Sequence, residues 1–299
     1  MSDGIPTSRN IPQGIKRAVR QRCGFGCVIC GMPLYEYEHM LGWATVKRHE
    51  AEEITLLCDQ HHREATSGLL PAEDVRKANL DPFNLRSGVS RPYDLHYSGD
   101  RCETLLGSSV SFAFQPKSFP AETVSVAIDA TPLLGFTLDE GHLFLHLQVF
   151  DEMNERVLSI VENQLVYSVA PWDITLVGRN LVIRSAPGEI LVDIKFDTPN
   201  RIVVQRGRFL LNGAELLLTP DYVLLTNHAR LISEVHVEGP RFGLVVGAGN
   251  IGGGAAVPMP EVSRYGFDRA AAIRWAEKSV KPVTDEIRPE TNSPKISGY

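Results

Sequence analysis

Two short cysteine-containing motifs, separated by 27 residues, most constrain how this chain can fold. The first is Cys27-x-x-Cys30 and the second is Cys58-x-x-His61. Each motif offers two ligands from a tight turn, and thiolates combined with an imidazole are typical of tetrahedral zinc. Because four protein ligands leave no open coordination position, the motifs predict a structural zinc site. The sequence therefore predicts a small zinc-stapled unit near its start.

The cysteine usage and the lack of an export signal together predict a cytoplasmic protein. Of five cysteines, four lie in the first sixty residues, and the odd total argues against a disulfide framework. Residues 1–16 contain no apolar run of the secretory type. The uncharged stretch 242–260 is dominated by glycine and interrupted by prolines, so no membrane span is expected there.

A basic helix is expected directly before the first cysteine motif. Asn10 and Pro12 suit the opening of a helix, and apolar residues then recur at helical spacing as far as Cys23. The other face carries the cations Lys16, Arg17, Arg20 and Arg22. Residues 1–35 hold five Lys/Arg against one Asp, a local charge of +4, in a chain whose net charge is −6. This patch predicts contacts with nucleic-acid phosphates, and the alternative is a merely solvated helix face.

Two further histidines and a glutamate accompany the zinc motifs. Glu38 and His39 lie between the two motifs, and His62 directly follows the last expected zinc ligand. With the basic helix, the Ile54–Cys58 segment and the paired histidines, this arrangement resembles the HNH endonuclease family, whose core is a ββα-metal finger. The resemblance covers about residues 15–80.

The resemblance implies a catalytic role for these residues. His39 would be the general base, because an imidazole with a pKa near ~6.5 can take a proton from water at neutral pH. Glu38 and His62 would hold a catalytic Mg²⁺ or Mn²⁺ ion, and the substrate would be DNA. The alternative is a zinc-containing module that binds DNA without cutting it. A role in bacterial anti-phage defence is an expectation by analogy alone.

One position departs from the family pattern. The family usually has an asparagine five residues before the second cysteine motif, where it orients the base, and here that residue is Glu53. A carboxylate could accept the second imidazole N–H of His39 and raise its basicity, which predicts an orienting role for Glu53. Alternatively, Glu53 faces solvent and Glu52 or His49 takes this place. His49 is also a further candidate metal ligand.

The second half of the chain is expected to be an all-β domain, either a sandwich or a solenoid. Apolar and β-branched runs alternate with turn signals, and Asn212-Gly213 favours a tight hairpin turn. The expected strands are 124–128, 143–150, 157–161, 174–177, 181–183, 190–196, 202–204, 209–211, 215–218 and 222–225. A GxGxxG pattern at 247–252 is not followed by a helix-forming segment, so no dinucleotide site is expected there.

These observations predict an α+β protein of two domains. The expected parts are a nuclease domain at 1–85, a linker at 86–107, an all-β domain at 108–262, and a C-terminal helix with a loose tail at 263–299. The β domain would control targeting, activation or assembly, by binding DNA, by recognising a signal molecule or by forming a homo-oligomer. A third hypothesis makes this domain a ligand sensor or scaffold and leaves the finger silent until it is triggered.

Overall fold

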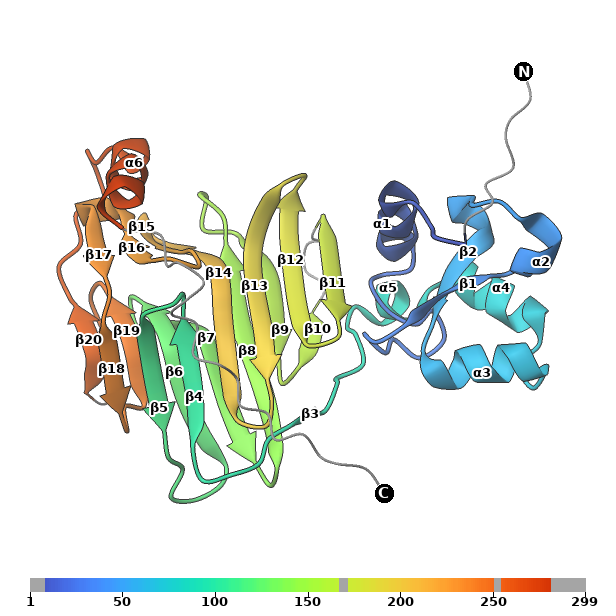
Figure 1. Ribbon diagram of the computed structural model, residues 1–299, viewed down its shortest axis with the longest axis horizontal. Coiled ribbons are helices and arrows are strands. Elements are labelled where there is room, and N and C mark those ends of the chain that lie inside the picture. Colours follow the sequence, from blue (N-terminus) through green and yellow to red (C-terminus); the bar gives the residue numbers. More distant parts are fainter. Residues whose placement is uncertain (1–8, 167–171, 250–253, 281–299) are drawn as a thin grey trace.

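The fold consists of a small zinc-finger-like unit at one end of a large two-sheet body (Figure 1). The computed structural model describes residues 9–166, 172–249 and 254–280. The protein is of mixed α+β type and consists mostly of sheet, with a helix near the C-terminal end, as the sequence predicts. Within the described residues, no helix is both long and apolar enough to cross a membrane.

The N-terminal unit, which we call the finger, is a two-stranded hairpin surrounded by short helices. Strand β1 pairs antiparallel with β2, and Glu38 lies opposite Thr55 in this register. The elements of the finger are α1 (Gln13–Arg22), β1 (Glu36–His39), α2 (Trp43–Val46), η1 (Ala51–Glu53), β2 (Ile54–Leu57), α3 (Asp59–Ser67), α4 (Ala72–Leu80) and α5 (Phe83–Ser87). Strand β2 is buried along its whole length because α1 and α3 both pack against the hairpin.

The large body is built from two mainly antiparallel sheets. In the described part of the chain, the first sheet has eight strands: β10 (Gln164–Val166), β9 (Arg156–Val161), β8 (His142–Phe150), β7 (Thr131–Asp139), β6 (Ala121–Ile128), β19 (Phe242–Val246) and β20 (Ala255–Met259), with β3 (Leu95–His96) beside β8. Consecutive strands are neighbours from β6 to β10, and the parallel strands β19 and β20 complete one edge.

The second sheet has ten strands within the same described ranges. These are β11 (Asp173–Val177), β12 (Asn180–Ala186), β13 (Glu189–Asp197), β14 (Arg201–Leu211), β15 (Ala214–Leu218), β16 (Val223–Leu225) and β17 (Arg230–Ile232), with β4 (Cys102–Leu106), β5 (Val110–Phe114) and β18 (Val235–Glu238) attached through β14. The short helix η2 (Thr226–His228) connects β16 to β17. The turn at Asn212-Gly213 is confirmed, since both residues have positive φ (49° and 74°), as a tight hairpin turn requires.

One hydrophobic core joins the two sheets. Leu145 and Leu147 of β8 contribute to it from the first sheet, and Val204 and Phe209 of β14 contribute from the second. Inward and outward residues alternate along β8, as expected for strands with one face on a core. Two sheets that share a core in this way correspond to the sandwich alternative. We therefore call this body the sandwich.

Strand β7 is an element that the sequence analysis did not anticipate. Its segment contains Pro132 and Gly135, two residues that weaken a strand pattern. Pro132 occupies the second position of the strand, and Gly135 lies where a side chain would collide with the chain opposite. A Cβ atom at Gly135 would lie 2.9 Å from the backbone oxygen of Thr123. Glycine therefore permits the close approach of β7 and β6.

The expected linker at 86–107 contains two strands of the sandwich. β3 pairs with β8, and β4 pairs in parallel with β14 and antiparallel with β5. Cys102 and Leu106 are buried on the inner side of β4. The preceding residues are rich in Pro, Asn, Ser and Gly, and this composition concealed the alternation that begins at Cys102. The sandwich therefore begins earlier than the sequence interpretation placed it.

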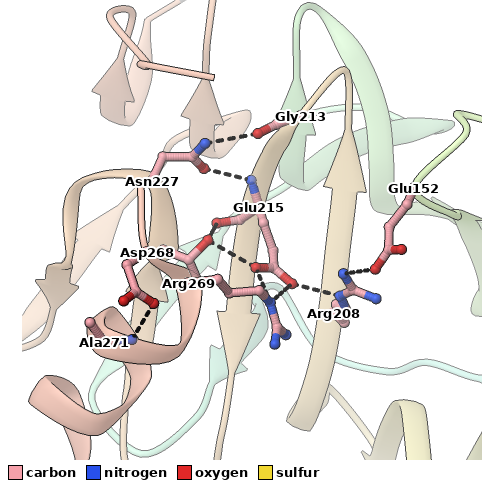
Figure 2. Close-up of polar contacts among 9 residues, drawn as sticks. Glu152, Arg208, Gly213, Glu215, Asn227, Asp268, Arg269 and Ala271 are labelled. Atoms are coloured by element: carbon pink, nitrogen blue, oxygen red, sulfur yellow. Dashed lines mark hydrogen bonds and ion pairs between the residues drawn. The ribbon is translucent and has the colours of Figure 1, made fainter. Parts of the chain in front are cut away.

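The predicted C-terminal helix is present as α6 (Arg269–Ser279), and a buried carboxylate anchors it to the sandwich (Figure 2). Glu215 of β15 is 2% exposed and accepts hydrogen bonds from Arg208 and Arg269. Asp268 caps the helix by accepting from the backbone N–H of Ala271. The tail expected after this helix lies outside the described residues.

This anchor predicts an acid-dependent loss of stability. Burial raises the pKa of Glu215, but hydrogen bonds from Arg269 and Arg208 outweigh burial and hold the pKa below its ordinary value. A depressed folded-state pKa stabilises the protein above the unfolded-state pKa, and this stabilisation disappears as the pH falls through the folded value. Urea unfolding followed between pH 7 and pH 3 should therefore depend less on pH in Glu215→Gln than in the wild type.

A matched exposed carboxylate provides the control for this prediction. Glu122 forms an ion pair with Arg241 in which both side chains are exposed, so Glu122→Gln should keep the wild-type pH dependence. Trp275, which lies on α6 and is 44% exposed, gives a local fluorescence signal for the helix. Equal pH dependence in wild type and Glu215→Gln would contradict the assigned role.

Candidate functional site

The four residues of the two cysteine motifs meet at one point of the finger. The ligand atoms of Cys27, Cys30, Cys58 and His61 all lie within 4.8 Å of one another. The sulfurs of Cys30 and Cys58 are 3.7 Å apart, and Nδ1 of His61 lies 3.2 Å from the sulfur of Cys58. A tetrahedron with zinc–sulfur bonds of about 2.3 Å has S···S edges of about 3.8 Å. The cluster therefore has the dimensions of a site for a metal ion such as zinc.

The local chain explains this convergence. Cys27 and Cys30 lie on a turn that ends with Gly31, where φ is +75° and the N–H donates to the carbonyl of Cys27. Cys58 is the N-cap of α3 and His61 follows within its first turn. A hydrogen bond with Cys27 is the main cause that lowers the pKa of Cys30 to about 5, which favours the thiolate that zinc requires.

A second group of polar side chains lies between β1 and α3. Oε2 of Glu38 is 2.9 Å from Nε2 of His62, and Oε2 of Glu36 is 3.5 Å from Nδ1 of the same ring. Glu36 and Glu38 share one face of the strand because strand side chains alternate. Burial raises the pKa of Glu38, while the facing His62 opposes this shift. A carboxylate and an imidazole in contact are suitable ligands for a divalent ion.

His39 lies at the end of β1 and contacts the α2 loop. Its Nε2 shares a hydrogen bond of 3.2 Å with Nδ1 of His49, and the ring of Trp43 is stacked on His49 at 4.7 Å. Partial burial and then the neighbouring His49 lower the pKa of His39, with Glu53 opposing. The lowered pKa favours the neutral form of the His39 imidazole. Consecutive strand residues point to opposite faces, so His39 and Glu38 contact different neighbours.

Glu53 is engaged by an arginine. Both of its carboxylate oxygens accept from the guanidinium of Arg48, and its backbone carbonyl accepts from the N–H of Met40 at the end of the hairpin. Hydrogen bonding to Arg48 lowers the pKa of Glu53. The residues in direct contact with the His39 ring are His49 and Trp43. Glu53 acts on His39 through its charge, and its predicted orienting role stays a prediction.

The cations of α1 make contacts within the protein. Arg22 donates to the carbonyls of Ala51 and Ile54, which holds α1 against the hairpin. Arg20 is 6% exposed and also donates to the hydroxyl of Tyr37. The Lys16 ammonium lies 5.7 Å from the centre of the Tyr37 ring.

The remaining contacts of α1 reach across to the sandwich. Arg20 forms a bidentate ion pair with Asp173 on β11, with N···O distances of 2.8 and 2.7 Å, and both side chains are buried. The Arg17 guanidinium lies 4.2 Å from the centre of the Trp172 ring. Gln21 donates to the carbonyl of Trp172. Helix α1, whose cations the sequence analysis assigned to DNA, therefore docks the finger on the edge strand β11 (Figure 1).

A small apolar cavity lies at this junction. Phe25 and Tyr35 of the finger line it together with Ile174, Leu181 and other sandwich residues, and its volume is about 70 Å³. An engineered apolar cavity of about 150 Å³ in another protein binds benzene, so the cavity at this junction has about half that volume.

The structure adds three residues to the site that the sequence analysis did not assign. Glu36 could have been found because it lies two residues before Glu38 on a predicted strand. Arg63 could have been found because it directly follows His62. Trp43 carries no such signal, because its contact with His39 depends on how the loop folds.

Comparison of the chain with protein-family models, curated proteins and solved structures finds no match.

Proposed function

We propose that the finger is a metal-dependent nuclease of the HNH type that hydrolyses phosphodiester bonds in DNA. The observation that carries the proposal is the contact of Glu38 with His62, on a helix whose start is fixed by the adjacent zinc cluster. His61 and His62 are consecutive on α3 and point about 100° apart, so one can bind zinc while the other faces β1. The cluster would thus position a second, catalytic ion-binding pair.

The roles follow from the chemistry of each side chain. Glu38 and His62 would hold a Mg²⁺ or Mn²⁺ ion, which would neutralise the phosphate and stabilise the departing oxygen. Two protein ligands leave most coordination positions open for substrate and water. His39 follows Glu38 at the end of β1, and its ring lies against His49 and Trp43. To accept the proton of the attacking water, this ring would turn from His49 toward the ion held by Glu38 and His62.

The proposal is tested by plasmid cleavage with the full chain. Wild type should nick or cut plasmid DNA when Mg²⁺ or Mn²⁺ is added, and His39→Ala should lower the rate by about 10²–10⁴-fold, the usual contribution of a general base. His146→Ala, which removes a histidine from β8 of the sandwich, is the matched control and should leave cleavage unchanged. Zinc content should be the same in all three proteins.

Two outcomes would reject the nuclease proposal. DNA binding without cleavage in any divalent ion would favour the non-catalytic zinc module. Cleavage at the wild-type rate by His39→Ala would show that the activity does not use this site. In this proposal the sandwich determines the position of the finger, because the buried ion pair between Arg20 and Asp173 holds α1 on β11.

A further inference from the structure

The site lacks cations from the helix that the sequence analysis assigned to DNA. Arg20 is buried against Asp173, Arg22 is bound to hairpin carbonyls, and Arg17 is stacked on Trp172. A phosphate could reach these groups only by displacing contacts within the protein. Lys16, the fourth cation of α1, lies against the Tyr37 ring, whereas α3 carries His62 itself and a cation next to it in sequence.

Arg63 is a cation in the right place. It follows His62 on α3, is exposed, and lines a surface hollow of about 450 Å³ together with Glu36, Asp59, His62 and Thr66. Four arginines of the finger, Arg20, Arg22, Arg48 and Arg86, have a carboxylate or carbonyl partner. Arg63 makes no ion pair with any residue in the described part of the chain. Its guanidinium is thus available to a ligand that enters the hollow.

The charges around the hollow determine when an anion can enter. Glu36 and Asp59 line the hollow with Arg63, and Glu38 contacts His62 beside it, so the three carboxylates and one guanidinium sum to −2. This charge opposes the entry of a phosphate, because charges within about 8 Å of one another are only partly screened at physiological salt. A divalent ion between Glu38 and His62 would bring the sum to zero. The guanidinium could then bind phosphate without opposition.

We propose that Arg63 binds a backbone phosphate of DNA beside the ion held by Glu38 and His62, so that DNA affinity at this face requires the divalent ion. This inference rests on the proposed nuclease function and names the group that positions the substrate. The planar guanidinium matches two phosphate oxygens, which a lysine ammonium cannot do. The contact is sequence-independent and sets the position of the backbone relative to His39.

The experiment measures DNA binding, not cleavage. Anisotropy of a labelled duplex is followed with the full chain in a His39→Ala background, with and without added Mg²⁺, over a range of NaCl concentrations. With Mg²⁺, Arg63→Ala should weaken binding about 10-fold and reduce the slope of log K against log[salt] by about 1. Without added Mg²⁺, the two proteins should bind equally weakly. Arg63→Lys should restore the salt slope but not the full affinity.

The matched control is Arg76→Ala, which removes an exposed arginine from the neighbouring helix α4. It should bind DNA as the background protein does. An equal loss in both arginine variants, an unchanged affinity of Arg63→Ala, or a loss that is the same without Mg²⁺ would overturn the proposal.

Failure of the two proposals can be told apart. If wild type does not cleave but Arg63→Ala still shows the Mg²⁺-dependent loss, hydrolysis is wrong and the phosphate site stands. If wild type cleaves and Arg63→Ala binds normally, the nuclease stands and the Arg63 assignment is wrong. If no DNA binding is measurable with Mg²⁺, both are rejected.

Discussion

Replacement of Cys58 by alanine is expected to abolish zinc binding and unfold the finger. Among the described residues, the finger has a small core of ten buried side chains, and two of these, Cys27 and Cys58, belong to the metal-site cluster. Units of this size usually depend on a metal or disulfide staple. Binding of structural zinc contributes about 10 kcal/mol or more to folding in comparable fingers, which exceeds what so small a core can supply.

The expected result is measured by metal analysis and by fluorescence of Trp43, which lies in the finger. Cys58→Ala should retain no zinc, and its Trp43 signal should match that of unfolded chain at temperatures where wild type is folded. Cys102→Ala is the control, since Cys102 is also buried but lies in the sandwich, away from the cluster. A Cys58→Ala protein with normal zinc content would show that the cluster is not a metal site.

The second large effect is expected at the junction between finger and sandwich. Asp173→Ala leaves the Arg20 guanidinium buried with only Tyr37 as a polar partner, and an unpaired buried charge costs about 3–5 kcal/mol. The cost can be avoided by undocking α1 from β11, so the finger should separate from the sandwich while both keep their cores. Trp172, whose ring contacts the Arg17 guanidinium, should become more exposed to solvent.

Limited proteolysis of the segment after α5 and quenching of Trp172 fluorescence by acrylamide measure this separation. Asp173→Ala should be cut faster and quenched more than wild type. Glu238→Ala removes an exposed ion pair with Arg101 on the same sandwich and should change stability by less than about 1 kcal/mol. Unchanged proteolysis in Asp173→Ala would mean that the apolar contacts alone hold the finger in place.

The candidate site could be predicted from the sequence where its metal-binding residues lie close together along the chain. Cys27 and Cys30 are brought together by a single turn, and Cys58 and His61 by the first turn of one helix, so the pairs follow from sequence distance alone. The Glu38–His62 contact required a hairpin to return the chain to α3, and the resemblance to a known finger supplied that information.

The parts that sequence could not predict depend on partners far along the chain. Arg20 lies 153 residues from Asp173, and no periodicity in α1 indicates which of its cations will be buried. Helical spacing placed Arg20 on a basic face, whereas the folded chain uses it at the junction. Strand β7 was concealed for a local reason, because Gly135 serves a close contact with β6 that becomes visible only in the paired sheet.

Phe25 has a further consequence for how the molecule can be divided. It belongs to the finger by sequence, between Cys23 and Cys27, but is 6% exposed as a member of the sandwich core, next to residues such as Ile174 and Leu181. Cutting the chain after α5 would expose the Phe25 side chain on the finger fragment. It would leave the space that this ring fills empty at the end of the sandwich fragment. Truncation or domain exchange at this boundary would therefore expose apolar surface on both pieces and make them prone to aggregation.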